Sequence, residues 1–385
     1  MRWQSQLRPL VGRLLKNHPE VKRSLKSAGR KVDLLRNTAA QILPQIIQAD
    51  THHIFIAVTA NCNLRCLGCR YGREFMAGSQ LPWPVVRDLL DDAKDLGVDG
   101  IRFYGGEPLV HKDIVRMVEH SIRRGLPTWL STNAILLKDK IDDLYKAGLR
   151  SIEIGFYGTD EEYNRYVQRE NQYTRVVESI AYTRERYGTD VSMGLCWVLM
   201  RPTCSVDSVR RVWAVAQRFA IPMGVNLLHY SLPYFADGPE GELQFRPEDG
   251  PAIQQVVEEL LRLKEERPEL LHQSARALRS IPDWLRLGPR MRVPCEAHNM
   301  LWVGADGTVQ LCYVTFKLGN LHQDRLRALL FTDAHQKAAR QAFGLHCPNC
   351  HCGYDTRIDT HLPSLIKYSF GPGPAILPSP RFNTD

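Results

Sequence analysis

The segment Cys62-Asn-Leu-Arg-Cys66-Leu-Gly-Cys69 places three cysteines in a C-x3-C-x2-C spacing, directly after the apolar run 54–58. Three closely spaced thiolates on one loop can bind three corners of a cubane iron–sulfur cluster and leave the fourth iron without a protein ligand. A structural zinc site is the alternative, but zinc takes four ligands and its usual signature is two separate cysteine pairs. The spacing therefore favours a cluster with one open iron.

A second motif, Tyr104-Gly105-Gly106-Glu107-Pro108, ends the next apolar run. Glycines let the backbone approach a ligand closely, because no Cβ stands in the way. Together the two motifs resemble those of the radical S-adenosylmethionine (SAM) superfamily. The resemblance implies a [4Fe-4S] cluster on Cys62, Cys66 and Cys69 whose open iron binds SAM, with residues 104–108 forming part of the SAM site.

The pattern along the chain predicts an α/β fold. From residue 54 onward, short β-rich runs alternate with helical periodicity. We expect strands at 54–59, 99–104, 127–131, 150–157, 191–199 and 222–228, and helices at 82–96, 110–124, 136–147, 172–187, 206–219 and 250–265. Repeated strand–helix units imply parallel strands joined by right-handed crossovers. The resemblance implies a partial (β/α)6 TIM-like barrel, with the motifs at the carboxyl ends of the strands.

Four further residues are candidates for SAM contacts on the basis of the resemblance. Ser131 and Asn133 end the third predicted strand, where relatives commonly place a polar residue against the ribose; an ordinary helix cap explains them equally well. Arg165 and Arg169 lie where relatives carry an arginine that binds the SAM carboxylate, and a guanidinium fork suits that task. Surface arginines on a helix are the alternative.

A second set of cysteines lies in the C-terminal part of the chain, at Cys295, Cys312, Cys347, Cys350 and Cys352. A predicted hairpin with its turn at Asp306-Gly307 places Cys295 and Cys312 near its opposite ends. Zinc and a cluster are both compatible with four thiolates. Behind a radical SAM core, the set resembles the SPASM and twitch extensions of the superfamily. This resemblance implies one auxiliary [4Fe-4S] cluster on Cys295, Cys312, Cys347 and Cys350, with Cys352 replacing one of them or remaining free.

The composition shifts along the chain predict five segments. They are a basic amphipathic helical segment at 1–50, a radical SAM partial barrel at 51–235, a helical connector at 236–294, a hairpin-based SPASM/twitch-like iron–sulfur domain at 295–362 and a Pro/Gly-rich tail at 363–385.

The net charge of +8 over 385 residues is concentrated near the N-terminus. Residues 1–40 hold ten Lys/Arg against two Asp/Glu, with apolar residues at helical spacing. Such a segment either contacts an anionic membrane surface or packs its apolar stripe on the body. Nucleic acid is not an expected partner, because aromatic residues for base stacking are missing from the basic segment.

The sequence shows neither a secretory signal nor a run of about 18 apolar residues. We therefore expect a cytoplasmic protein, with possible membrane association through residues 1–40. In that compartment the 10 cysteines are better explained as cluster ligands than as disulfides.

The resemblance implies an enzyme in which reductive cleavage of SAM gives a 5′-deoxyadenosyl radical that abstracts hydrogen from a substrate C–H bond. An auxiliary cluster offers an electron acceptor, so we expect an oxidoreductase that performs a two-electron dehydrogenation or oxidative bond formation. A reductant such as flavodoxin or ferredoxin would supply the first electron. Candidates for the base that removes the departing proton are Tyr157, His229, Tyr230 and His298.

Three alternatives stay open at this point. A redox-neutral epimerisation or adenosyl addition would return hydrogen to the substrate radical, and Cys196 on a predicted barrel strand is a candidate donor. The substrate itself is a small molecule, a lipid or a peptide. A non-enzymatic iron–sulfur or zinc protein is the alternative from another class, although such proteins do not need a Gly-Gly-Glu-Pro motif.

Overall fold

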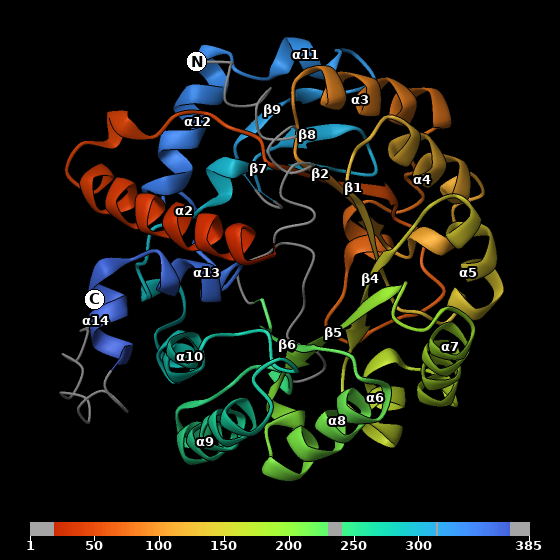
Figure 1. Cartoon of the computed structure of the whole chain (residues 1–385), viewed down its shortest axis with the longest axis vertical. Coiled ribbons are helices and arrows are strands. Elements are labelled where there is room, and N and C mark those ends of the chain that lie inside the picture. Colours follow the sequence, from red (N-terminus) through yellow and green to blue (C-terminus); the bar gives the residue numbers. More distant parts are fainter. Residues whose placement is uncertain (1–18, 230–240, 313–314, 370–385) are drawn as a thin grey trace.

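Nine strands form one sheet in the part of the chain that this computed structural model describes, residues 19–229, 241–312 and 315–369. The spatial order is β6-β5-β4-β3-β2-β1-β7-β8-β9, and the seven strands β1 to β7 all run parallel to one another (Figure 1). The first six strands are β1 His53–Thr59, β2 Gly100–Gly105, β3 Thr128–Thr132, β4 Ser151–Phe156, β5 Ser192–Leu199 and β6 Met223–Leu227. All six were predicted from the sequence, with ends within two residues.

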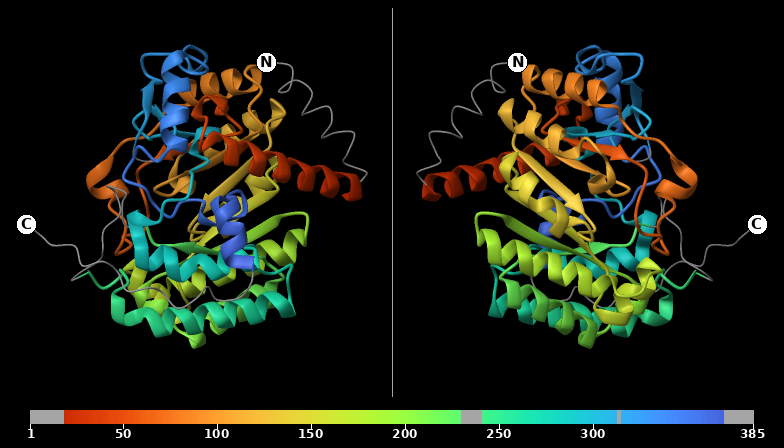
Figure 2. Two further views of the ribbon diagram at one scale, coloured as in Figure 1. Left: turned by 90° about the vertical axis from the view of Figure 1, so that its left-hand side faces the viewer. Right: turned by 90° about the vertical axis from the view of Figure 1, so that its right-hand side faces the viewer.

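Helices connect successive strands and cover the outer face of the curved sheet (Figures 1 and 2). They are α3 Trp83–Asp95, α4 Ile114–Arg123, α5 Leu137–Lys146, α7 Gln172–Tyr187, α8 Val206–Phe219 and α9 Gly250–Glu266. The six predicted helices are confirmed. Helix α6 Asp160–Val167 was not predicted; it is a short polar helix whose N-terminus is closed by a capping box between Thr159 and Glu162. The sheet and its helices form an α/β barrel that does not close.

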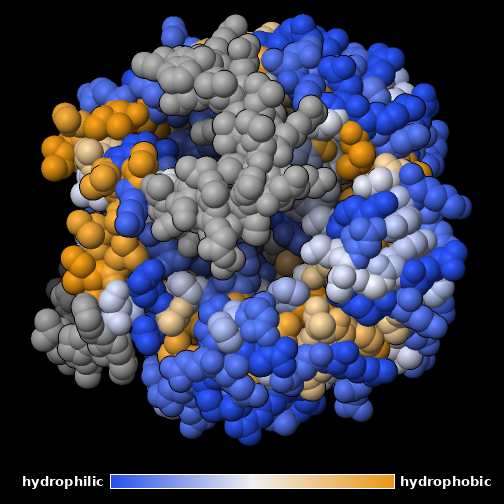
Figure 3. All heavy atoms as spheres, viewed as in Figure 1, coloured by the Kyte–Doolittle hydropathy of each residue, from blue (hydrophilic) through white to orange (hydrophobic). Residues whose placement is uncertain are grey.

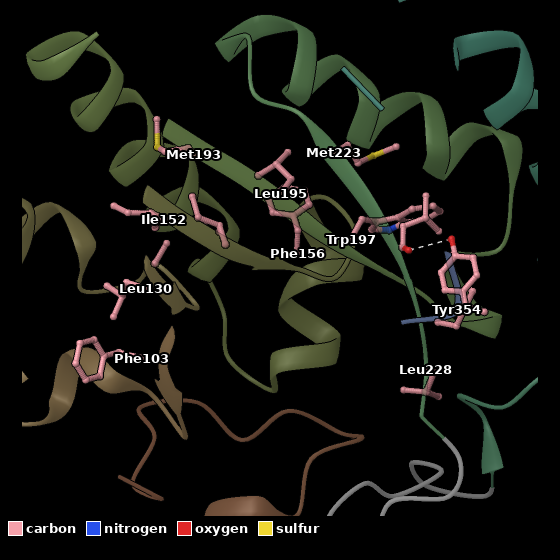
Figure 4. Packing of buried hydrophobic residues seen from close by; sticks show 14 of the residues in the cluster. Phe103, Leu130, Ile152, Phe156, Met193, Leu195, Trp197, Met223, Leu228 and Tyr354 are labelled. Carbon is pink, nitrogen blue, oxygen red and sulfur yellow. Dashed lines mark hydrogen bonds between the residues drawn. The ribbon is translucent and has the colours of Figure 1, made fainter. Parts of the chain in front are cut away.

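The two faces of the barrel sheet differ in polarity. On the outer face, apolar side chains are fully buried in the core that also contains the helices, among them Phe103, Leu130, Ile152, Phe156 and Trp197 (Figure 4). The alternate positions on the inner face carry Arg102, Ser131, Glu153 and Cys196, which are only partly buried. Parallel strands buried on both faces are usually apolar throughout. The alternation therefore indicates a cavity inside the barrel.

The C-terminal hairpin extends the barrel sheet. Strand β7 Met300–Val303 pairs in parallel with β1, and β8 Thr308–Gln310 and β9 Lys317–Asn320 continue the sheet in antiparallel fashion. The expected hairpin is confirmed, but the expected position of its two cysteines is wrong. Because Trp302 pairs with Gln310, the start of β7 lies beside the end of β8. Cys295 and Cys312 are therefore at the same end of the hairpin.

The remaining helices surround this C-terminal region. They are α2 Pro19–Ala40, α10 Ala275–Leu287, α11 Leu326–Leu329, α12 Asp333–Phe343, α13 Tyr354–Asp359 and α14 Leu362–Ser369. Helix α14 occupies residues that were predicted to begin a Pro/Gly-rich tail, because apolar residues at helical spacing precede the prolines. Short 3-10 helices lie at Pro44–Ile46, Pro108–Val110, Arg201–Thr203, Pro247–Asp249, Gly288–Arg290 and Ala297–Asn299. Among the described residues, no helix combines the length and the apolar character that a membrane crossing requires.

The β6 edge of the sheet is closed by side chains. The amide of Gln273 accepts from the backbone N of Val225 at 2.9 Å and donates to its carbonyl at 3.1 Å. The hydroxyl of Tyr354, the first residue of α13, donates to the same carbonyl at 3.2 Å (Figure 4). These bonds satisfy backbone groups that an open edge strand would leave unpaired. They also fix the C-terminal cysteine segment against the barrel.

Candidate active site

Both sets of cysteines line one cavity of about 960 Å³. The cavity lies inside the barrel and extends to the C-terminal region, and its wall includes Cys62, Cys66, Cys69, Cys295, Cys312, Cys347, Cys350 and Cys352. The two sets are far apart in sequence, but the extension of the barrel sheet by β7 and β8 brings them to a common space.

The glycine motif positions the first cysteine loop. The backbone N of Gly106 donates to the carbonyl of Thr59 at 2.7 Å, and that of Glu107 donates to Asn61 at 2.9 Å. A Cβ on Gly105 or Gly106 would lie closer than 3.0 Å to backbone atoms of residues 59–61. Gly105 also has a φ of +142°, which side chains rarely permit. The glycines are thus required by the approach of β2 to the residues that precede Cys62.

The side chain of Glu107 stabilises the site through hydrogen bonds to three neighbouring residues. Its buried carboxylate accepts hydrogen bonds from Thr132 Oγ1 at 2.7 Å, from the backbone N of Asn133 at 2.7 Å and from the backbone N of Leu109 at 3.0 Å. Burial raises the pKa of Glu107 to about 7 in spite of these bonds. Tyr104, Gly105 and Gly106 line the cavity, whereas Glu107 and the buried Pro108 do not. Within the motif, the side chain of Glu107 connects the ends of β2 and β3.

Asn133 contacts the cysteine loop. Its Nδ2 donates to Asn63 Oδ1 at 2.8 Å and to Cys62 Sγ at 3.8 Å, while its Oδ1 accepts from the backbone N of Ile135 at 3.0 Å. The residue therefore forms the local turn expected of a cap and also reaches the first predicted cluster ligand. Its predicted contact with the SAM ribose stays a prediction.

The two candidate arginines differ in position. Arg169 Nη1 donates to the carbonyl of Asn63 at 2.9 Å, next to Cys62. Arg165 instead forms an ion pair with Glu242 at 2.6 Å, and neither arginine is among the residues that line the cavity. Arg169 is therefore the better placed of the two for a ligand at the cysteine loop.

Backbone amides stabilise the sulfur atoms of both sets. The amide two residues downstream donates to the sulfur at 3.4 Å in three cases, at Cys62, Cys295 and Cys350. The same type of bond lowers the pKa of the Cys69 and Cys347 thiols, against the larger raising effect of burial. Hydrogen bonds to sulfur are typical of iron–sulfur ligands and tune the cluster. The donor sets of both cysteine groups therefore fit thiolate-bound clusters.

Within the second set, the thiols lie close enough to influence one another. Burial, followed by the charges of Cys350, Cys295 and Cys312, raises the pKa of Cys352. The charge of Cys295 also contributes to the raised pKa of Cys347 and of Cys350. In the described part of the chain, no three His, Cys, Asp or Glu side chains are arranged to hold a single metal ion. Which four of the five cysteines bind a cluster stays a prediction.

A polar wall crosses the inner face of the barrel, and most of it was not predicted from the sequence. Arg102 on β2 forms an ion pair with Glu153 on β4 at 2.6 Å, and Ser131 on β3 bonds to both. Ser131 is thus held inside the wall, and its predicted ribose contact is untested. Glycines occupy inward positions beside these residues, at Gly155, Gly194 and Gly224. The available signal was the recurrence of polar residues and glycines at alternate positions of the predicted strands 2 to 6.

The candidates for proton or hydrogen transfer are distributed unevenly. Tyr157, His229 and Cys196 line the cavity, whereas the buried His298 does not. Tyr230 lies outside the described residues. Burial lowers the pKa of His229 to about 4, so its imidazole is neutral at pH 7. Tyr157 packs against Tyr166 with ring centroids 4.5 Å apart, and burial raises the pKa of its hydroxyl.

Residues 56–200 match the family model of the Radical SAM superfamily. The chain is 32% identical over 135 residues to the PqqA peptide cyclase of Bradyrhizobium diazoefficiens, a match that covers 34% of this chain and 36% of the relative. It is 31% identical over 134 residues to the GTP 3′,8-cyclase of Clostridium botulinum, covering 34% of this chain and 42% of that protein. These matches thus span about two fifths of the curated relatives' length.

Solved structures show a similar fold over most of the chain. Streptococcus suis SuiB bound to the precursor peptide SuiA has a TM-score of 0.60 at 15% identity, covering 86% of this chain and 76% of that one. Native anSMEcpe with bound AdoMet has a TM-score of 0.57 at 16% identity, covering 80% and 91%. At such low identity, these similarities establish the architecture.

Proposed function

We propose that this protein is a radical SAM oxidoreductase, because residues 56–200 match the Radical SAM family model and members of that family use a [4Fe-4S] cluster and SAM. It catalyses a net two-electron oxidation of a polar substrate, either a dehydrogenation or an oxidative bond formation. The observation that carries the proposal is the single cavity lined by both cysteine sets. A substrate in that cavity lies between the place where hydrogen is removed and a second redox centre.

The first loop would hold the catalytic cluster through Cys62, Cys66 and Cys69. When bound, the reduced cluster and SAM supply a 5′-deoxyadenosyl radical that takes a hydrogen atom from a substrate carbon. Asn133 donates to the sulfur of Cys62, and Arg73 donates to the carbonyls of Cys66 and Cys69, so both hold the loop in its geometry. The electron that forms the radical comes from an external reductant such as flavodoxin or ferredoxin.

The second set would hold an auxiliary [4Fe-4S] cluster through Cys295, Cys312, Cys347 and Cys350, with Cys352 as the alternative ligand. The balance of the oxidation is simple. Once the substrate has lost a hydrogen atom, that cluster would supply the acceptor for the second electron, and a base in the cavity would accept the proton. His229 is the better candidate for that base, since its neutral imidazole lines the cavity, whereas burial raises the pKa of the Tyr157 hydroxyl and keeps it protonated.

The substrate class that we propose is a peptide. Its support is twofold: the relative from Bradyrhizobium diazoefficiens is named for a peptide substrate, and SuiB was captured with its precursor peptide. The wall built by Arg102, Ser131 and Glu153 presents charged and hydrogen-bonding groups, which suit amide and carboxylate groups better than a lipid chain.

A redox-neutral reaction is the second candidate, and Cys196 is the observation in its favour. Its thiol lines the cavity, and burial together with the charge of Glu153 raises its pKa to about 12. The sulfur therefore keeps its hydrogen at neutral pH and could return a hydrogen atom to a substrate radical.

One experiment separates these outcomes. Reconstituted enzyme is incubated anaerobically in D2O with SAM, dithionite and either the peptide fraction or the lipid extract of the host cells. We expect 5′-deoxyadenosine formation to rise with the peptide fraction, to fall after protease digestion of that fraction, and to accompany a product lighter by two hydrogens. A product of unchanged hydrogen count that carries deuterium, and that disappears in C196A, would favour the redox-neutral reaction. Stimulation by the lipid extract alone would contradict the peptide substrate.

We also propose that an apolar patch next to the basic segment contacts an anionic membrane surface. Leu35 on α2, Ile42 and Ile366 on α14 are 70%, 83% and 62% exposed, and apolar residues gather on this side of the molecule (Figure 3). Asn37 Nδ2 approaches the carbonyl of Thr360 at 3.5 Å, which places α2 beside the segment that leads to α14. Residues 19–40 hold six Lys/Arg against two Asp/Glu, so the helix complements acidic headgroups.

Vesicle flotation tests this contact. We expect binding to vesicles that contain phosphatidylglycerol, weaker binding to pure phosphatidylcholine, and loss of binding in the double variant L35E/I42E. F331S, which changes an exposed apolar residue outside the patch, is the matched control. Equal binding of the double variant and the wild type would contradict the proposal.

A further inference from the structure

Arg357 on α13 is a buried guanidinium at the second cysteine set. Only 2% of the residue is exposed, and it lines the same cavity. Its donors reach the carbonyl of Val293 at 3.2 Å, the carbonyl of Cys350 at 2.6 Å and Asn349 Oδ1 at 3.1 Å. Its guanidinium carbon lies 4.6 Å from the centre of the Trp284 ring. Every one of these partners is electrically neutral.

The positive charge of Arg357 has no carboxylate partner among the described residues: none of the ion pairs within 19–229, 241–312 and 315–369 includes it. Buried charges in proteins are almost always paired, because an unpaired charge loses its hydration without compensation. Neutral carbonyls satisfy the N–H groups, yet they do not balance the charge. A balancing negative charge is therefore expected nearby.

The thiols of the second set are the nearest candidates for that negative charge. Arg357 donates to the backbone carbonyl of Cys350, and it lines the cavity together with Cys347, Cys350 and Cys352. A cubane bound by four thiolates carries a net negative charge, which grows by one when the cluster accepts an electron. A fixed positive charge in a dry environment stabilises the more negative, reduced form.

Resting on the auxiliary cluster of the proposed function, we infer that Arg357 is the fixed counter-charge of that cluster and raises its reduction potential. It is a positioning and tuning residue, since it contacts the ligand loop and not the substrate. The consequence is functional: a higher potential makes the cluster a better acceptor for the electron of a substrate radical. Arg357 would thereby favour oxidation over return of hydrogen.

The chain offers a matched control for the charge. Arg292 lies three residues before Cys295 in the sequence, but its side chain is exposed to solvent. Water screens an exposed charge far more effectively than a buried one. Removal of Arg292 should therefore have little effect on the cluster, whereas removal of Arg357 should have a large one.

The test uses the full chain with the substitutions C62A, C66A and C69A, so that only the second set can hold iron. Iron content and the EPR signal after dithionite reduction are recorded first, and the midpoint potential is then determined by EPR-monitored redox titration. R357Q, R357K and R292Q are compared in this background. R357K keeps the charge and loses the planar fork, so it separates electrostatics from the hydrogen bonds.

We expect R357Q to lower the equilibrium constant for reduction of the auxiliary cluster at least tenfold. For a one-electron couple, this corresponds to a midpoint potential lower by about 59 mV. The equilibrium constant for reduction in R357K and in R292Q should stay within about threefold of the parent. R357K keeps the buried charge, and R292Q removes a charge that water already screens. Loss of iron from R357Q but not from R357K would also support the charge role. An unchanged potential in R357Q, or equal losses in R357Q and R357K, would overturn it. A parent that binds no iron would instead overturn the auxiliary cluster itself.

Discussion

Asn133 Nδ2, at the end of β3, donates a hydrogen bond to Cys62 Sγ at 3.8 Å, so a strand end contacts the first predicted cluster ligand directly. The carboxylate of Glu107 accepts a hydrogen bond from the backbone N of Asn133 at 2.7 Å. The glycine motif, the third strand and the cysteine loop therefore form one connected unit. A change at any of the three should be measurable at the cluster.

Removing the Asn133 donor should lower the reduction potential of the first cluster. Hydrogen bonds to sulfur stabilise the reduced form, so we expect N133A and N133D to shift the midpoint to more negative values, by up to about 59 mV for a tenfold effect. N133D is the matched variant, because it keeps the oxygen that accepts from Ile135. EPR-monitored titration in the C295A/C350A background reports this cluster. A wild-type potential in both variants would show that the bond has no influence.

Gly106→Ala should prevent iron binding at the first loop. The new Cβ would lie closer than 3.0 Å to backbone oxygens of Ala60 and Asn61, which must then move together with Cys62. We expect reconstituted G106A to lose about half of its iron, that is, one of two cubanes. G250A is the control, since the Cβ that alanine adds there has no neighbouring atom within 4 Å. Full iron loading of G106A would contradict the role assigned to this glycine.

Arg169→Ala should weaken SAM binding, whereas Arg165→Ala should not. Arg169 donates to the carbonyl of Asn63 in the cysteine loop, whereas Arg165 pairs with Glu242. A lost charge-assisted contact costs about 1.5–3 kcal/mol, so we expect the Kd for SAM to rise roughly tenfold or more in R169A. Equilibrium dialysis of reconstituted protein measures it. An equal effect of the two substitutions would contradict the assignment.

Glu107 should make stability depend on pH. Its pKa is raised from 4.5 to about 7 in the folded protein. Between these values the folded state binds more protons than the unfolded state, so the free energy of unfolding falls as the pH rises from about 4.5 to about 7. The full effect is about 3 kcal/mol. Anaerobic urea unfolding at several pH values should show a shallower decline in E107Q than in the wild type. Parallel declines would contradict the raised pKa.

The strands and the cofactor motifs could be predicted from the sequence because their signals are local. Each barrel strand is a short apolar run followed by a helical period, and the spacing of Cys62, Cys66 and Cys69 carries its chemistry directly. The sequence alone does not show which residue of the glycine motif, 104–108, has which structural role. That Glu107 bonds to Asn133 while Gly106 packs on Asn61 depends on which strands are neighbours.

Other features depend on contacts between distant segments. The ion pair of Arg102 with Glu153 joins β2 to β4, and nothing in either strand alone indicates its partner. The relation of Cys295 to Cys312 follows from the direction of β8, which sequence spacing does not give. Arg357 is a single arginine in a short polar helix, and only its burial distinguishes it from a surface residue.

The most direct test of two redox centres in one cavity is the iron content of three reconstituted proteins: the wild type, C62A/C66A/C69A, and C295A/C312A/C347A/C350A. We predict about eight, four and four irons per chain, with 5′-deoxyadenosine released from SAM only where the first set is intact. Four irons in the wild type and none in C62A/C66A/C69A would show that the second set binds no cluster, and would contradict a cavity shared by two redox centres.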